Sequence, residues 1–231
     1  ISMWAIKIFI KIIFSRIPLK YHLWSKLGIF KNGRMNEFEY SKKIFFGHLE
    51  DIRKIKKIKN PRILEIGPGD GISSAIFAKF YESKKVYLLD IGDFADKDIE
   101  NYKKIISYLK NNEPYKKINL SKIKSFEDIL ITFNANYLTK GLESMKTLKD
   151  KSVDYIFSHS VMEHIRKSDV DELINEMYRV LADDGLISHN INYKDHLQES
   201  LNNLRFSEKI WESDFFANSG FYTNRIPAVE M

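Results

Sequence analysis

Ten consecutive residues, Arg62-Ile63-Leu64-Glu65-Ile66-Gly67-Pro68-Gly69-Asp70-Gly71, join a short apolar run to three glycines at alternate positions. A helical pattern of apolar residues follows at once, at Ile72, Ala75, Ile76 and Phe80. Strand, tight turn and helix in this order predict the first unit of an open α/β sheet. Glycine lets the backbone of such a turn come close to a ligand, because no Cβ stands in the way.

A second strand is predicted after this helix, where the apolar run 86–89 ends in Asp90. Asp90 lies nineteen residues beyond Gly71, close to the spacing at which a carboxylate accepts hydrogen bonds from ribose hydroxyls. The dinucleotide pattern G-x-G-x-x-G would require a glycine where Ile72 stands. The spacing E-x-G-x-G-x-G that begins at Glu65 instead resembles the first motif of the class I S-adenosylmethionine-dependent methyltransferases.

The length and composition fit one α/β domain with an appendage. Of the 231 residues, 44% are hydrophobic, which is enough for a sizeable core. The chain has no cysteine, which excludes disulfides, cysteine-ligated zinc and thiol nucleophiles, and is compatible with a reducing cytoplasm. The net charge of +6, from 37 basic and 31 acidic residues, is interpreted as a solvated lysine-rich surface rather than a dedicated anion-binding face.

The first segment, residues 1–31, is basic and apolar, with six lysines and arginines and no acidic residue. A helix is predicted that ends near Pro18. It is too short and too interrupted by lysine to span a bilayer, which takes about 20 apolar residues. Two interpretations stay open. The helix packs against the main domain or a second copy of the chain, or it lies at a membrane surface, where cations beside an apolar face suit anionic lipid.

Strand and helix patterns alternate along the rest of the chain. Strands are expected at residues 136–139, 153–158 and 186–191, and helices at residues 36–59, 97–109, 125–132, 168–182 and 201–211. Ser125 is predicted to cap its helix together with Asp128, and Gly185 to serve as the C-cap of the helix before it. The patterns indicate an α/β, Rossmann-like, doubly wound and mostly parallel sheet with helices on both faces, preceded by an N-terminal helical extension.

Three later motifs also resemble class I methyltransferases of the type 11-like group, in the expected order and spacing. They are Val153-Asp154-Tyr155-Ile156-Phe157-Ser158, Val161-Met162-Glu163-His164-Ile165 and Arg179-Val180-Leu181-Ala182-Asp183-Asp184-Gly185. The resemblance implies that residues 60–231 form a Rossmann-like domain for S-adenosylmethionine, which leaves as S-adenosylhomocysteine, and that residues 1–59 form a helical lid. That family normally adds a final hairpin of two strands, which is expected to be incomplete here.

The resemblance also assigns cofactor-binding residues. They are Glu65, Gly67, Pro68, Gly69, Asp70, Gly71, Asp90, Ile91, Ser158 and His159. The acidic and glycine positions 65–71 would hold the methionine part, Asp90 the ribose and Ile91 the adenine, while Ser158 and His159 would lie beside the sulfonium. The acidic residue that often contacts adenine from the third strand has no convincing counterpart in this chain.

Candidate catalytic residues follow the fourth and fifth strands. They are His159, His164, His189, Asp195 and His196. A hydroxyl acceptor benefits from a positioned base, and histidine is the natural candidate because its unperturbed pKa is about 6.5. His159 follows its strand directly, whereas structural roles compete at His164 and His189. Asp195 and His196 suit a carboxylate-oriented base or, with His189, a divalent ion; no metal is predicted.

A narrower resemblance concerns the acceptor. Gly33-x-Met35, Ser188-His189-x-Ile191-x-Tyr193-x-Asp195-His196 and Tyr222-x-Asn224-Arg225 look like bacterial methyltransferases encoded with surface-polysaccharide genes, although that group usually has Asp where Asn192 stands. The resemblance implies methylation of a sugar hydroxyl in capsule or lipopolysaccharide synthesis, on a nucleotide-linked or lipid-linked sugar. The expected location is the cytoplasm, at the inner face of the membrane where residues 1–31 bind lipid.

Two alternative functions belong to other classes. The chain could methylate RNA or another small molecule with its basic surface, although no basic motif interleaved with aromatic residues indicates an RNA-binding module. It could also be a non-catalytic partner or membrane-associated scaffold that keeps the fold. The intact glycine turn and Asp90 favour an enzyme over a scaffold, and no nucleic acid is expected as a partner.

Overall fold

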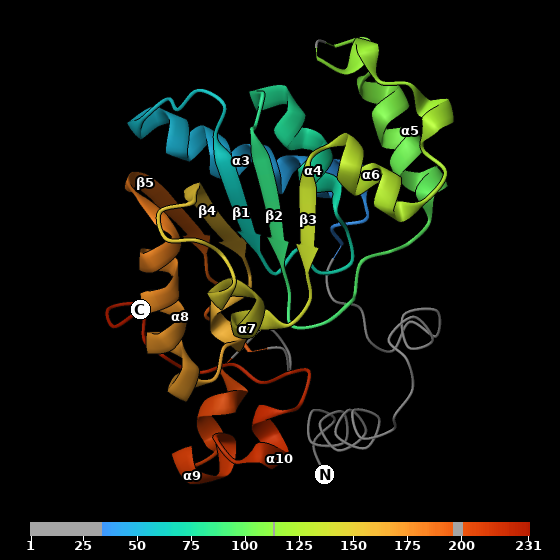
Figure 1. Ribbon diagram of the computed structural model, residues 1–231. Helices are drawn as coiled ribbons and strands as arrows, with labels where there is room; N and C mark the ends of the chain where they lie inside the picture. Colours follow the sequence, from blue (N-terminus) through green and yellow to red (C-terminus); the bar gives the residue numbers. More distant parts are fainter. Residues whose placement is uncertain (1–33, 113, 196–200) are drawn as a thin grey trace. The chain divides into compact units, whose positions relative to one another are not determined.

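The computed structural model describes residues 34–112, 114–195 and 201–231. Its centre is a parallel five-stranded sheet in the order β3-β2-β1-β4-β5 (Figure 1). The strands are β1 (Arg62–Ile66), β2 (Lys85–Leu89), β3 (Ala135–Leu138), β4 (Val153–His159) and β5 (Leu181–Asn190). This confirms the Rossmann-like α/β fold predicted from the alternation of strand and helix patterns.

The chain divides into two compact units. The sheet unit comprises residues 31–159 and 174–189 and holds the glycine turn. The described part of the other unit, here called the C-terminal unit, comprises residues 160–173, 190–195 and 201–231. Helix α3 belongs to the sheet unit, and the lid function predicted for residues 1–59 stays a prediction.

The strand order places a switch point beside β1. Strands β2 and β3 follow on one side of β1, whereas the chain returns to its other side for β4. Ile66, the last residue of β1, is in register with both Leu89 of β2 and Ser158 of β4. In open α/β sheets a ligand binds outside the carboxyl ends of the strands at such a point, so the segments that follow these three residues are where a site is expected.

Helices cover both faces of the sheet. In Figure 1, α3 and α4 lie on one face and α7 lies on the other. The α-helices are α3 (Phe38–Ile55), α4 (Ser73–Ala78), α5 (Ile99–Leu109), α6 (Phe126–Thr132), α7 (Gly141–Lys146), α8 (Lys167–Val180), α9 (Glu208–Trp211) and α10 (Asp214–Ala217). Short 3-10 turns occupy Lys79–Tyr81, Tyr115–Lys117, Leu120–Lys122, Met162–His164 and Asn202–Arg205.

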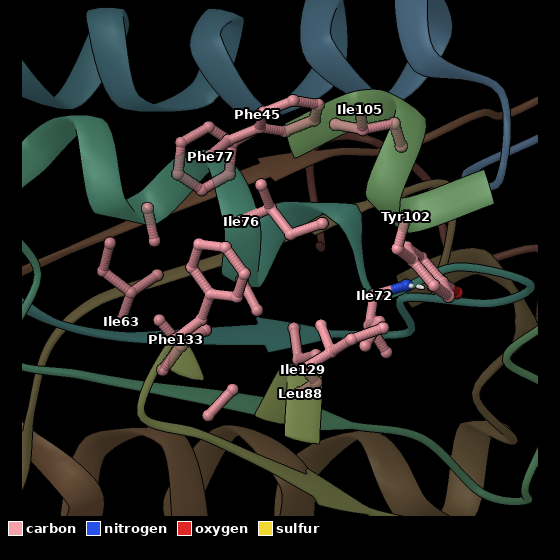
Figure 2. Packing of buried hydrophobic residues seen from close by; sticks show 14 of the residues in the cluster. Phe45, Ile63, Ile72, Ile76, Phe77, Leu88, Tyr102, Ile105, Ile129 and Phe133 are labelled. Atoms are coloured by element: carbon pink, nitrogen blue, oxygen red, sulfur yellow. Dashed lines mark hydrogen bonds between the residues drawn. The ribbon is translucent and has the colours of Figure 1, made fainter. Parts of the chain in front are cut away.

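The core of the sheet unit lies between the sheet and α3, α4 and α5. Figure 2 shows Phe45 of α3 beside Phe77 of α4, with Ile63 of β1 below them. Tyr102 of α5 is fully buried, and its hydroxyl accepts a hydrogen bond from the Ile72 amide at 3.4 Å (Figure 2). Helix α3 is therefore a structural part of the core, although it precedes the first strand.

Most predicted elements of the sheet unit are found within a few residues of their expected bounds. The helix expected at residues 36–59 is α3 and stops at Ile55. The capping box of α6 is confirmed, since the Ser125 hydroxyl accepts from the Asp128 amide and the Asp128 carboxylate accepts from the Ser125 amide. The predicted C-cap at Gly185 is wrong, because α8 already ends at Val180 and Gly185 lies inside β5 without a positive φ.

A second apolar cluster forms the core of the C-terminal unit. Trp211 is fully buried among Phe206, Phe216, Phe221 and Tyr222, with ring centroids 5.1–6.4 Å apart within this group. The single helix predicted at residues 201–211 is wrong, because the chain instead forms a 3-10 turn and the short α9. Within the described ranges no strand follows β5, and no helix there is long and apolar enough to cross a membrane. The predicted N-terminal helix lies outside the described residues.

Candidate functional site

The three glycines of the turn after β1 serve different purposes. Gly67 and Gly69 have positive φ angles of 72° and 63°, a region that residues with a Cβ rarely adopt. Gly71 is required for space, since a Cβ there would stand 2.4 Å from the carbonyl oxygen of Met35. The turn is tied to β2, because the Gly67 amide donates to the Leu89 carbonyl at 2.8 Å. The backbone is thus bent at the carboxyl ends of β1 and β2, where Gly67 and Gly69 are partly exposed.

Asp90 follows β2 directly and connects it to the glycine turn. Its Oδ2 accepts a hydrogen bond from the Gly69 amide at 3.0 Å, and its Oδ1 accepts one from the Ile91 amide at 2.7 Å. Burial raises the pKa of Asp90 to about 6, although both amide bonds act in the opposite direction. A carboxylate oxygen can accept more than one hydrogen bond, so Asp90 retains capacity for the hydroxyls of a ligand.

Glu65 is the most unusual carboxylate of the sheet unit. It lies in β1, is 2% exposed, and its Oε2 is buried without a hydrogen-bond partner. Burial raises the pKa of Glu65 to about 8, and the nearby charge of Asp90 acts in the same direction. A buried acceptor atom without a hydrogen-bond partner destabilises the fold unless a ligand donates a hydrogen bond to it. A cationic ligand group at this position would favour the ionised carboxylate.

An apolar wall borders Asp90. Ile91 is 77% exposed, and Gly141 at the start of α7 lies so close that a Cβ there would come within 3.2 Å of the Ile91 side chain. The Tyr137 hydroxyl fixes the loop behind Ile91, since it accepts from the amides of Phe94 and Ala95 at 2.9 and 3.1 Å. The exposed apolar side chain of Ile91 follows the Asp90 carboxylate directly, and contact of Ile91 with the adenine stays a prediction.

Asp70 has a different environment from its neighbours in the turn. Its Oδ1 accepts hydrogen bonds from the amides of Met35 and Asn36, at 2.7 and 3.3 Å, just before α3 begins. The Asn36 carbonyl accepts from the side chain of Asn101 on α5 at 3.0 Å. The segment before α3 is therefore attached to the glycine turn and to α5. Cofactor binding by Asp70 stays a prediction.

Taken together, these groups fit the cofactor that the sequence predicts. S-adenosylmethionine carries a sulfonium and an ammonium group, a ribose and an adenine. The chain offers a buried acceptor at Glu65, a bent backbone at Gly67 and Gly69, a carboxylate at Asp90 and an exposed apolar side chain at Ile91. Pro68 lies between Gly67 and Gly69, the two glycines that have positive φ angles, and its contact with the cofactor stays a prediction.

Three histidines gather at the ends of β4 and β5 in the sheet unit. His159 ends β4, and burial lowers its pKa. His189 of β5 pairs through Nδ1 with the hydroxyl of Ser158 at 2.7 Å, and burial lowers its pKa to about 4. The third is His48 of α3, whose ring centroid lies 5.7 Å from that of His159. The imidazoles of His48 and His189 are therefore neutral at pH 7 and can accept a proton.

His48 was not among the residues selected from the sequence. Its Nδ1 pairs with the hydroxyl of Ser188, 140 positions away, at 2.7 Å. The available signal was a histidine on the apolar face of a predicted helix, where a buried histidine of the core is the ordinary interpretation. Met35 and Asn36 were also missed as neighbours of the glycine turn, because a contact between backbone groups leaves no sequence pattern.

The other predicted catalytic residues belong to the C-terminal unit or lie outside the described residues. His164 pairs through Nδ1 with the Tyr222 carbonyl at 2.8 Å. Asp195 is buried and accepts a hydrogen bond from the Asn203 amide at 3.1 Å. His196 is outside the described residues. Where the structure describes the chain, no three side chains of His, Cys, Asp or Glu are arranged to hold a metal ion.

One comparison with known proteins identifies the family of the chain. A family model described as "Methyltransferase domain" matches residues 64–188, which is 125 of 231 residues and thus more than half of the chain. The matched range begins in β1 and ends in β5, so it includes the glycine turn, Asp90 and the end of β4. None of the curated proteins compared with the chain matches it.

Solved structures with a similar fold come from several organisms. The PH0226 protein of Pyrococcus horikoshii is 18% identical over 66% of this chain and 58% of its own length, with a TM-score of 0.40. An arsenic(III) S-adenosylmethionine methyltransferase of Chlamydomonas reinhardtii is 19% identical over 71% of this chain and 48% of its own, with a TM-score of 0.41. The YcgJ protein of Bacillus subtilis is 23% identical over 75% and 67%, with a TM-score of 0.41. The chain thus spans about half to two thirds of the length of these three proteins.

Proposed function

The chain belongs to the methyltransferase domain family. From this premise we propose that it is an S-adenosylmethionine-dependent methyltransferase and that it methylates a hydroxyl oxygen of a sugar in bacterial capsule or lipopolysaccharide synthesis. The proposed acceptor is a nucleotide-linked or lipid-linked sugar, methylated in the cytoplasm or at the inner face of the membrane. The observation that carries the proposal is His159, a neutral imidazole at the carboxyl end of β4, one residue beyond the register position of Ile66.

The proposed chemistry requires alignment and one proton transfer. S-adenosylmethionine, when bound, supplies a methyl group on a positively charged sulfur that leaves as a neutral thioether. The acceptor hydroxyl loses its proton to an imidazole nitrogen of His159, and its oxygen bonds to the methyl carbon as the carbon–sulfur bond breaks with its electron pair on sulfur. A sugar hydroxyl is a weak nucleophile at pH 7, so a positioned base contributes about 10²–10⁴-fold. The glycine turn and Asp90 supply the alignment.

A sugar acceptor is supported by two further features. The motif at residues 188–196 and the motif Tyr222-x-Asn224-Arg225 resemble polysaccharide-associated methyltransferases. Asn224 of the second motif is buried, and its side-chain amide donates to the carbonyls of Met162 and Ile165 at 2.8 and 3.0 Å. These bonds give Asn224 a structural function directly beside the Glu163-His164 pair. The motif thus stabilises the segment after β4.

Turnover with candidate acceptors tests this function. Nucleotide-linked sugars and lipid-linked glycans are incubated with the enzyme and S-adenosylmethionine, and products are identified by mass spectrometry and by formation of S-adenosylhomocysteine. We expect a methyl ether on one sugar hydroxyl, and His159→Gln should lower kcat by about 10²–10⁴-fold while cofactor affinity stays the same. Methylation of RNA with steeply salt-dependent binding, and none of any sugar, would contradict the proposed acceptor.

Cofactor binding provides a separate test of the proposed residues. Asp90→Ala removes the carboxylate that would hold the ribose and also the partner of the Gly69 amide. We expect the affinity for S-adenosylmethionine to fall roughly 10- to 100-fold in calorimetry, since hydrogen bonds to a charged group contribute about 1.5–3 kcal/mol. Asp93→Ala is the matched control, because Asp93 lies on the same loop and forms an exposed ion pair with Lys97. Equal affinities of the two variants would contradict the assignment of Asp90.

A further inference from the structure

His48 is a buried imidazole that the proposed methyl transfer does not use. It is 7% exposed on α3, among the apolar side chains of Phe45, Leu49 and Ile52. Its ring stacks on Phe157 of β4 with centroids 5.2 Å apart. Its Nε2 is buried and has no hydrogen-bond partner in the part of the chain that the structure describes. A phenylalanine or leucine would fill this space without leaving a buried polar atom unpaired, so packing alone does not explain a histidine here.

The face of α3 that carries His48 also contacts His159, which ends β4. Tyr40 and His48 are eight residues apart, about two helical turns, so both point to the same side. Both rings meet the ring of His159 edge to face, with centroids 6.3 Å away for Tyr40 and 5.7 Å away for His48. Helix α3 therefore fixes the orientation of the imidazole at the end of β4.

The partner of His48 does not fix its tautomer. A backbone carbonyl at Nδ1 would require a proton on that nitrogen, and a backbone amide would exclude one. The Ser188 hydroxyl, 2.7 Å from Nδ1, can donate or accept. The ring thus stays in place while Nε2 either carries a proton or presents a lone pair.

We propose that Ser188 and His48 form a positioning pair for His159, and that the imidazoles of His48 and His159 together carry at most one positive charge. The inference rests on the proposed function, in which His159 accepts the proton of the acceptor hydroxyl. Two positive charges on rings 5.7 Å apart repel one another in a buried place, so such a pair titrates as one coupled unit. His48 stays neutral when His159 becomes cationic, and acts through the orientation of that ring.

The charged and titratable groups around His48 agree with this assignment. His159 of β4 and His189 of β5 disfavour a cation at His48, and only Asp51 on its own helix favours one. Burial is the largest effect and, with the two histidines, lowers the pKa of His48 to about 4. The His48 imidazole is therefore neutral at pH 7.

Histidine NMR on the ligand-free full chain tests the coupling without any acceptor. With ¹⁵N-labelled histidine, His159→Phe should raise the pKa of His48, because one source of repulsion is lost. Ser188→Ala should change the tautomer balance of His48, read from its two ring nitrogen shifts. Ser158→Ala is the matched control: it removes the hydroxyl beside His189 and should change the nitrogen shifts of His189 but not those of His48. An unchanged pKa in the first variant, or unchanged shifts in the second, overturns the pair.

Kinetics then separates a positioning function from a structural one. His48→Phe keeps a ring of similar size on Phe157, and should lower kcat roughly 10- to 100-fold with the KM for S-adenosylmethionine unchanged and the acid limb of the kcat profile moved. His48→Gln should recover part of kcat, since its amide can still bond to Ser188. A lower Tm with an unaltered pH profile would show a structural residue and overturn the inference. Failure of every sugar to react would instead contradict the proposed function, because the NMR measurements need no acceptor.

Discussion

Gly71 and Gly47 lie in the same unit, but a side chain would meet very different surroundings at the two positions. A Cβ at Gly71 would stand 2.4 Å from the Met35 carbonyl oxygen and 2.8 Å from the Asn36 nitrogen. These backbone atoms belong to the segment whose Met35 and Asn36 amides donate to Asp70. A Cβ at Gly47, in the middle of α3, would meet nothing within 4 Å. The two positions therefore separate the effect of space from that of helix propensity.

We expect Gly71→Ala to lower the free energy of unfolding by about 1–3 kcal/mol, as overpacking at a rigid site does. Gly47→Ala should raise it by about 0.5–1 kcal/mol, because alanine favours the interior of a helix. Urea unfolding of both variants measures the difference. Equal stabilities would show that the segment before α3 moves aside at no cost, and would contradict the close contact with the glycine turn.

The residues predicted for cofactor binding illustrate what a single residue reveals in sequence. Gly67, Gly69 and Asp90 were identifiable because their spacing along the chain is typical of a glycine turn followed by a strand that ends in a carboxylate. His48 was not, because its meaning depends on Ser188 and His159, which come from two strands far along the chain. A buried histidine in an apolar pattern has the same appearance in sequence whether or not it has a polar partner.

At the scale of elements, α3 is attached to the sheet unit in two ways. Its apolar face packs in the core, and the segment at its start is bonded to the glycine turn. Asp70 of the glycine turn accepts hydrogen bonds from the two amides that precede the helix, those of Met35 and Asn36. Its side chain thus stabilises a segment that lies 35 positions earlier in the sequence. The buried Met35 amide would be left without a partner if the carboxylate were removed.

Asp70→Ala should therefore lower the free energy of unfolding by about 1–3 kcal/mol and speed hydrogen exchange at the amides of Met35 and Asn36. Asp98→Ala is the control, since Asp98 also accepts a backbone amide, that of Glu100 at the start of α5. Loss of that cap should cost about 1 kcal/mol and leave exchange at Met35 as it was. Faster exchange at Met35 in both variants would indicate general destabilisation.

Element types were predictable where local chemistry determines them. The capping box at Ser125 and Asp128 uses groups three residues apart, and it is found as predicted. The cap at Gly185 was wrong, because aspartates and a glycine after an apolar helix have the same pattern whether the helix continues to them or stops at Val180 and a strand begins. Whether these residues continue the helix or begin a strand depends on pairing with the rest of the sheet, and the local sequence carries no signal of that pairing.

At the scale of the whole molecule, four buried titratable groups make stability depend on pH in opposite directions. Glu65, with a pKa of about 8 when folded and about 4.3 when unfolded, holds an extra proton in the folded chain between these values, so stability falls as pH rises. Asp90 acts likewise up to a pH of about 6. His48 and His189 have a pKa of about 4 when folded and about 6.5 when unfolded, so their effect raises stability with pH across that interval.

Above about pH 6.5 only the Glu65 effect remains among these four groups, which gives a prediction with a definite sign. The ligand-free enzyme should lose stability between about pH 6.5 and pH 8, by at most about 1.4 kcal/mol per pH unit. Glu65→Gln should flatten this dependence, as measured by urea unfolding at several pH values. Parallel pH curves for the two proteins would show that Glu65 is ionised in the folded state.

The fold as a whole was accessible from sequence because most strands and helices of the sheet unit carry a local pattern. The candidate site was accessible only where one segment supplies it. The glycine turn was therefore predictable, whereas the surroundings of His159 were not, since α3, β4 and β5 each contribute a ring or hydroxyl to them.

The bond from Asp70 to the chain ahead of α3 also limits how far this enzyme can be shortened. A version that started at β1 would keep every glycine and acid of the turn, yet it would expose the aromatic underside of the sheet and leave the Asp70 carboxylate without its two backbone donors. The glycine turn would then be the first region to lose order. Trimming from the front should accordingly abolish cofactor affinity well before it reaches any residue expected to touch the cofactor.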